Sequence, residues 1–124
     1  MIQTWRLDSA RQTLALGSVA GRMPEVIYWG APLPAEEDLA AVMAGTRLDV
    51  TGGMLDENPD LAICPEAARS FHGQPGLIVR GADGTPLLPQ FALTQAQQAD
   101  LRLTLTCTDA GNRLTYVATF EIDP

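Results

Sequence analysis

The sequence contains no lysine, and this shortage of positive charge excludes several classes of partner. Its eight cationic residues are all arginines, against fifteen acidic residues, for a formal net charge of −7. Such a surface repels the phosphates of nucleic acids and the headgroups of anionic lipids. We therefore expect neither a nucleic acid nor a membrane as a partner.

Cysteine is scarce as well. The two cysteines, Cys64 and Cys107, fall in different predicted elements with no second pair nearby. Neither a disulfide framework nor the paired spacing of a zinc site is present, so two buried free thiols are expected. The glycine patterns that cradle nucleotides are also absent. The sequence therefore predicts no metal and no cofactor.

Long hydrophobic runs are missing too. No apolar stretch approaches the roughly 20 residues that span a bilayer, and the opening from Met1 to Arg6 lacks the layout of a signal peptide. A cytoplasmic location is therefore expected. With 124 residues, 46% hydrophobic and 19% charged, the chain has the size and composition of a single globular domain, residues 1–124.

What the sequence does contain is β-strand alternation. Between 101 and 122, apolar residues alternate with mostly polar ones on both sides of a turn at 109–112, which predicts a hairpin with one apolar and one threonine-rich face. Further strands are predicted over 2–7, 12–16, 25–29, 76–80 and 86–93, with breaks at 8–9, 17–21 and 82–84. Short strands with turns about every ten residues predict an all-β fold, mainly an antiparallel β-sandwich.

One short helix and one long irregular segment complete the pattern. The helix is predicted over 35–44, with Glu36, Glu37 and Asp38 in its first turn, where they face the positive end of the helix dipole. Gly45 is expected as its left-handed C-cap. Residues 46–74 show no periodicity, and a segment of that length is either functional or packed across a neighbouring surface.

This irregular segment holds most of the candidate chemistry. Asp56, Glu57 and Asp60 resemble clustered metal ligands or a glycosidase pair, but they lack the register of a calcium loop, and solvated loop acids are the simpler interpretation. His72 is a candidate general base, although Ser70 before it matches no nucleophile motif. A histidine with a structural role is the alternative.

Aromatic and paired charged residues suggest binding instead of catalysis. Tyr28 and Trp29 are adjacent strand residues that point to opposite faces, so at most one of them can line a sugar-stacking surface while the other packs inward. Glu66 and Arg69 are three residues apart, and they either pair with each other on the surface or bind a partner chain.

The order of these pieces resembles the start of bacterial α-galactosidases of glycoside hydrolase family 36. The resemblance extends over essentially the whole chain. It is carried by Trp5-Arg6-Leu7-Asp8, by Val26-Ile27-Tyr28-Trp29-Gly30 with Ala31-Pro32-Leu33 after it, by the segment from Asn58-Pro59 to Gly76-Leu77, and by the turn Asp83-Gly84. The resemblance implies the first part of an N-terminal β-supersandwich.

In that family the catalytic barrel lies downstream of this domain, and neither of its aspartate motifs is present here. The resemblance therefore implies a chain that is inactive alone, packs on the catalytic barrel of its parent protein, contacts like subunits in a homo-oligomer, and meets a galactoside only indirectly. It further implies that the rim of a neighbouring active site is built by Asp49, Met54, Asp56 and Glu57, and Trp29 of the aromatic pair is a further candidate for this rim. The expected interface residues are Glu66, Arg69, Phe71 and His72.

The residues also leave two alternative functions open, and they predict self-association of the isolated chain. The alternative to an accessory domain is an autonomous, lectin-like carbohydrate-binding sandwich that uses Tyr28, Trp29, Phe71 and the loop acids. A third hypothesis is a small hydrolase that uses His72. If the sandwich lacks its later strands, unpaired edges should make the isolated chain self-associate, most simply as a dimer.

Overall fold

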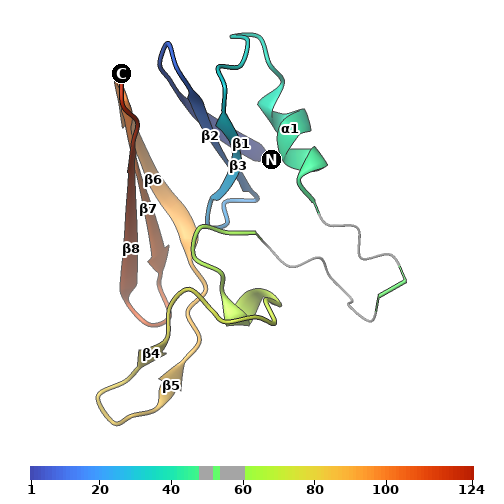
Figure 1. Ribbon diagram of the computed structural model, residues 1–124. Helices are drawn as coiled ribbons and strands as arrows, with labels where there is room; N and C mark the ends of the chain where they lie inside the picture. The colour runs from blue at the N-terminus through green and yellow to red at the C-terminus, as the bar shows by residue number, and fades with distance from the viewer. Residues whose placement is uncertain (48–51, 54–60) are drawn as a thin grey trace.

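The computed structural model describes residues 1–47, 52–53 and 61–124, and it confirms the all-β fold (Figure 1). Two antiparallel sheets of three strands run in the orders β1-β2-β3 and β6-β7-β8. Their strands are β1 (Ile2–Asp8), β2 (Thr13–Val19), β3 (Glu25–Gly30), β6 (Ala92–Ala99), β7 (Arg102–Asp109) and β8 (Leu114–Glu121). A small third sheet pairs β4 (Val79–Arg80) with β5 (Pro86–Leu87), and the described helices are α1 (Leu39–Gly45) and the 3₁₀ turn η1 (Ala67–Arg69).

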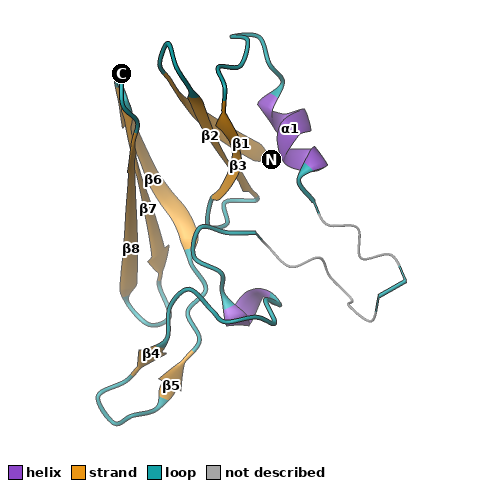
Figure 2. Cartoon of the chain, in the orientation of Figure 1, coloured by secondary structure: helices purple, strands orange, loops and turns teal. Residues whose placement is uncertain are grey.

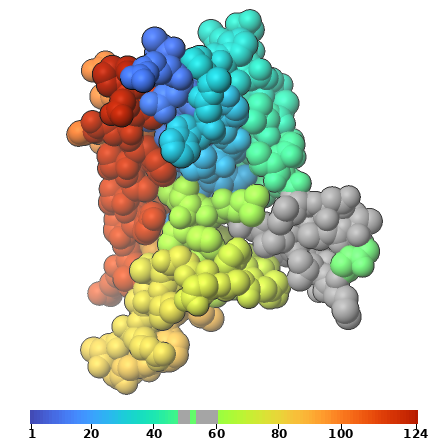
Figure 3. Space-filling view, viewed as in Figure 1, coloured from blue at the N-terminus to red at the C-terminus, as the bar shows by residue number. Residues whose placement is uncertain are grey.

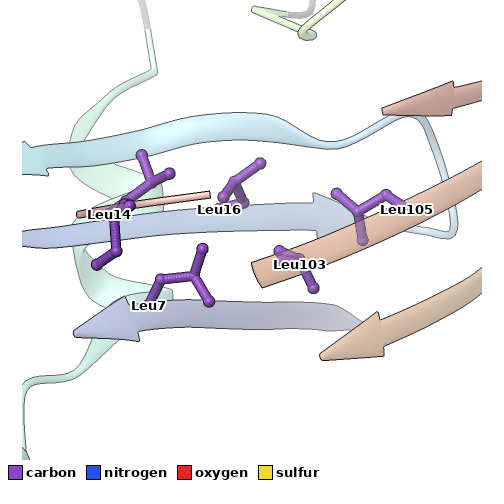
Figure 4. Close-up of a cluster of buried hydrophobic side chains, with 6 residues drawn as sticks. Leu7, Leu14, Leu16, Leu103 and Leu105 are labelled. Carbon is purple, nitrogen blue, oxygen red and sulfur yellow. The ribbon is translucent and has the colours of Figure 1, made fainter. Parts of the chain in front are cut away.

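The two larger sheets face each other across an apolar core. Leu7, Leu14 and Leu16 come from the first sheet, and each is at most 8% exposed. They pack against Leu103 and Leu105 of β7, which are fully buried, and against Ile122, just past the end of β8 (Figure 4). The alternating leucines of each strand therefore fill the space between the sheets, as a sandwich requires.

The helix α1 forms a third layer on the outer face of the first sheet. Met43, which is 1% exposed, packs against Ala15 of β2 and Ile27 of β3. A Cβ atom built on Gly17 would lie 2.6 Å from the Sδ atom of Met43, so a larger residue here would force the buried Met43 side chain to shift. β2 is therefore covered on both faces.

The predicted helix boundaries were wrong at both ends. α1 begins at Leu39, and Asp38 is its N-cap because the Oδ1 atom of Asp38 accepts a hydrogen bond from the Ala41 amide at 3.1 Å. Glu36 and Glu37 therefore precede the helix. The C-cap is Thr46, whose hydroxyl donates to the Met43 carbonyl oxygen at 2.7 Å, and no left-handed glycine is needed there.

The strand predictions also need correction in several places. The predicted break at 17–21 is wrong at its start, because Gly17 and Ser18 continue β2 opposite Thr4 and Gln3. The predicted strands 76–80 and 86–93 shrink to the two-residue strands β4 and β5. β6 (Ala92–Ala99) was not predicted as a strand of its own, although it supplies one edge of the second sheet.

The C-terminal hairpin is confirmed almost to the residue. β7 pairs with β8 from Arg102 opposite Glu121 to Asp109 opposite Leu114. The outer face is rich in threonine, with Thr104 and Thr119 opposite each other and their hydroxyl oxygens 3.3 Å apart. The prediction that Cys64 and Cys107 are buried free thiols is confirmed as well.

The segment between residues 61 and 91 crosses the open end of the sandwich and is mostly irregular, as predicted for its first part (Figure 2). The Ile63 amide donates to the Pro24 carbonyl oxygen at 2.8 Å, which ties the segment to the first sheet. Phe91 is 1% exposed and packs in a second core cluster with Met23, Cys64 and Cys107. No helix in the described part of the chain is long and apolar enough to cross a membrane.

Candidate functional site

A groove of about 380 Å³ lies where β3, an edge strand of the first sheet, approaches the end of β8. We call it the Trp29 groove. It is lined by Gln12, Leu14, Val26, Trp29, Phe120, Glu121, Ile122 and Asp123. Leu14 and Ile122 belong to the core between the sheets, so the floor of this groove is an uncovered extension of that core.

Trp29 is the largest exposed feature of the groove. Its side chain is 73% exposed, although it is the fifth residue of β3 and pairs opposite Leu14 of the central strand. The indole Nε1 donates a hydrogen bond to the Gln12 side-chain oxygen at 3.0 Å, which fixes the direction of the ring. A fixed, exposed indole next to apolar side chains is a stacking surface for a flat apolar group.

The neighbouring tyrosine points the other way, as the strand alternation predicted. Tyr28 is half-buried against the cluster of Ala15, Ile27 and Met43 beneath α1. Its hydroxyl donates to the Ala31 carbonyl oxygen at 2.6 Å. One ring therefore packs inward and the other lines the groove, and this part of the prediction is confirmed.

Polar groups stand at the end of the groove formed by β8 and the residues after it. Glu121 and Asp123 are exposed carboxylates that accept hydrogen bonds from hydroxyl or amide donors. Arg102 engages Glu121 with two hydrogen bonds to the same carboxylate oxygen, Oε2, at 2.9 and 2.6 Å. An apolar wall with carboxylates at one end suits a ligand that has both an apolar face and hydroxyl groups.

Four of the five predicted rim residues lie outside the described residues, namely Asp49, Met54, Asp56 and Glu57. Trp29 is the fifth, and it lines the groove. Glu121, Asp123 and Val26 were missed as candidates. The sequence signal for the two acids was their place at the end of an alternating strand, but only the packing of the two sheets brings that end near Trp29.

The predicted pair of Glu66 and Arg69 forms, but in the interior. Glu66 is 7% exposed, and its Oε2 atom accepts a hydrogen bond from the Phe91 amide at 2.7 Å. Arg69 Nη2 donates to the Phe91 carbonyl oxygen at 3.1 Å, and the two side chains approach to 3.6 Å. The pair therefore holds the backbone of Phe91, and Glu66 is not presented at the surface.

The other two predicted interface residues are more accessible. Phe71 is half-buried and His72 is exposed. A Cβ atom built on Gly73 would lie 2.8 Å from the ring of Phe71, so the ring folds back over its own loop. Neither residue lines the Trp29 groove.

The buried thiols of Cys64 and Cys107 are unreactive at neutral pH. Burial, followed by the nearby carboxylate of Glu66, raises the pKa of the Cys107 thiol to about 11. The same two causes raise the pKa of Cys64. Thiols protonated at neutral pH are poor nucleophiles and poor metal ligands. Within the described residues, no three His, Cys, Asp or Glu side chains gather closely enough to hold a metal ion.

Comparison with protein families, with curated proteins and with solved structures found no match for this chain.

Proposed function

We propose that the chain is a non-catalytic accessory module, the first part of the N-terminal domain of an α-galactosidase of glycoside hydrolase family 36. In this role it packs against the catalytic barrel of its parent protein and takes part in contacts between like subunits. The reaction takes place on the barrel. The galactoside meets this module only at the edge of the site.

The observation that carries the proposal is the uncovered apolar side of β3. Val26 is 44% exposed and Trp29 is 73% exposed, whereas Ile27 between them is 6% exposed beneath α1. The strand is thus covered by the helix on one face and left open on the face turned toward the second sheet. An open apolar groove of this size marks a place where another surface packs.

An activity measurement tests the proposal directly. The 124-residue chain is compared with the same chain extended through the codons that follow Pro124, using a chromogenic α-galactoside as substrate. We expect hydrolysis by the extended protein alone. A stop codon directly after Pro124, or hydrolysis by the 124-residue chain, would exclude an accessory role.

Tryptophan quenching tests the docking surface itself. Trp5 and Trp29 are the two tryptophans of the chain, and only Trp29 is highly exposed. We expect acrylamide to quench Trp29 strongly in the 124-residue chain and weakly in the extended protein. The Trp29→Phe variant of each protein serves as the control, because the difference between wild type and variant is the signal of Trp29 alone. Equal quenching of Trp29 in both proteins would place the docking surface elsewhere.

A second candidate function is direct carbohydrate binding in the Trp29 groove. It is favoured by the combination of an oriented indole with the carboxylates of Glu121 and Asp123, since pyranoses present an apolar face and a polar edge. Titration with galactosides would then change the fluorescence of Trp29 saturably, and Trp29→Phe would abolish this change. An unchanged spectrum at millimolar sugar would remove this candidate.

A further inference from the structure

A second hollow lies between residues 64–78 and the β4–β5 hairpin. The hairpin projects from the body of the molecule (Figure 3). We call it the hairpin cavity. Its volume is about 130 Å³, and it shares no lining residue with the Trp29 groove. Its walls are mainly apolar, and they include Pro65, Pro75, Leu77, Val79, Leu87 and Phe91.

The walls of the hairpin cavity are tied together by hydrogen bonds. The Gly76 amide donates to the Pro65 carbonyl oxygen at 2.9 Å, which fixes the segment from Pro75 to Leu77 against the start of η1. The opposite wall is fixed by the Phe91 amide, which donates to Glu66 Oε2 at 2.7 Å. The cavity is therefore formed before any ligand arrives, so binding does not require the ordering of a loop.

The polar groups around the cavity are already engaged or neutral. One carboxylate oxygen of Glu66 accepts from Phe91, and the other lies 3.6 Å from Arg69. Arg80 donates to the Gly84 carbonyl oxygen at 3.3 Å. Cys64 contributes a thiol whose pKa is raised by burial, so it is protonated at neutral pH. A charged ligand would lose its hydration here without a matching partner.

The volume decides the size of the ligand. An engineered cavity of about 150 Å³ in another protein, lined by leucine, isoleucine and phenylalanine, stays dry and binds benzene or xenon. The hairpin cavity is slightly smaller and is also lined mainly by apolar side chains, and it opens to solvent beside Ile78 and Leu88, which are 65% and 66% exposed. We propose that the hairpin cavity binds a small, uncharged, apolar molecule of about the size of a benzene ring. This inference is independent of the proposed accessory function.

Benzene is the probe that tests this proposal. Methyl resonances are followed by NMR during a benzene titration of the 124-residue chain. We expect saturable shifts at Leu77, Val79 and Leu87, which line the cavity, and no shifts at Leu103 and Leu105 in the core between the sheets. The core leucines thus serve as an internal control for general effects of the solvent.

A matched pair of variants sharpens the test. Ala68 lines the cavity, whereas Ala82 is exposed in the hairpin turn and does not line it. Ala68→Leu fills the cavity and should weaken benzene affinity about tenfold or more, which corresponds to at least about 1.4 kcal/mol. Ala82→Leu should leave the affinity unchanged. Ala67→Leu, at a second lining position, replaces Ala68→Leu if that variant does not fold.

Two outcomes would overturn the proposal. Absence of saturable shifts at Leu77, Val79 and Leu87 in the wild-type chain would show that the cavity does not bind an apolar molecule. Tighter binding of N-acetylphenylalaninamide than of benzene would show that the cavity takes the side chain of a partner polypeptide and not a free ligand. Neither outcome bears on α-galactoside hydrolysis by the extended protein.

Discussion

β2 and β6 are strands of similar length with opposite environments. β2 is the central strand of the first sheet, with Leu14 and Leu16 facing the second sheet and Ala15 and Gly17 facing α1. β6 is an edge strand, and seven of its eight residues are exposed. β2 is therefore held by packing on both faces, whereas β6 is held mainly by its backbone pairing with β7.

The largest effect is expected from a truncation in β2. Leu16 is fully buried in the core between the sheets, so Leu16→Ala should lower the free energy of unfolding by about 2–5 kcal/mol through lost transfer energy and a new cavity. Gln97→Ala in β6 is the control and should change it by less than about 0.5 kcal/mol. Urea denaturation measures both. Similar decreases in the free energy of unfolding of the two variants would contradict the proposed difference between β2 and β6.

The contact of β2 with α1 gives the next largest effect. Because a Cβ atom on Gly17 would lie 2.6 Å from Met43 Sδ, Gly17→Ala should destabilise the fold by about 1–3 kcal/mol. Met43→Ala alone should also destabilise it, since Met43 is buried. The double variant should lose less than the sum of the two single losses, because the smaller side chain at 43 relieves the clash. Strict additivity in urea denaturation would contradict the proposed contact.

The same contrast explains what the sequence could predict. The alternation that includes Leu103 and Leu105 of β7 is a signal of one buried face, and together with the regular spacing of turns it led to the correct all-β fold. β6 has the sequence ALTQAQQA, which has little alternation and few residues that favour strands, so pattern alone did not reveal it. β6 forms a strand because the backbone of β7 supplies hydrogen-bond partners along its length. Pairing of this kind depends on the fold and has no local signature.

In the candidate site, too, features of a single strand were predictable and contacts between distant segments were not. The alternation of Tyr28 and Trp29 predicted that at most one of the two rings would line a surface while the other packs inward, since it is a property of a single strand. The Trp29 groove itself needs the end of β8 beside β3, and the interior position of Glu66 needs Phe91, which is 25 residues away in the sequence. The spacing of residues along the sequence predicts neither of these two contacts. Long-range packing therefore had to be seen in the structure.

A smaller, pH-dependent effect is expected at Asp8, at the end of edge strand β1. Hydrogen bonds from Arg6, followed by one from the Thr13 hydroxyl, hold the pKa of Asp8 below its ordinary value of 3.8. Because the folded-state pKa is the lower one, this stabilisation is complete above the unfolded-state pKa and is lost as the pH falls through the folded-state pKa.

Replacement of Asp8 tests this coupling. The Asp8 side chain is 45% exposed, so Asp8→Asn should lower the free energy of unfolding by less than about 1 kcal/mol at pH 7. The difference from wild type should shrink as the pH falls below 3.8. Glu121→Gln removes an ion pair whose side chains are 61% and 60% exposed, and no measurable effect is expected from it. A pH-independent loss in Asp8→Asn would indicate a structural cause.

The smallest effect on stability, and the most specific effect on association, is expected at β6. Its eight residues carry no charge and no proline, and they form an edge of the second sheet, whereas β1 carries Arg6 and Asp8. In a chain with a net charge of −7, an uncharged edge is where a second copy can approach with the least repulsion. Unpaired backbone groups along such an edge pair readily with another strand. We therefore expect the isolated chain to form dimers through β6.

Lysine substitutions test whether the dimer forms through the β6 edge or through another edge strand. Gln97→Lys places a charge on β6 and should shift the dimer toward monomers in light scattering, without a change in the free energy of unfolding of the monomer beyond about 0.5 kcal/mol. Thr115→Lys makes the same change of charge on β8, the opposite edge of the second sheet, and should leave the dimer intact. If both variants weaken association equally, net charge and not the β6 edge controls it. A wild-type chain that stays monomeric at high concentration would contradict the predicted dimer.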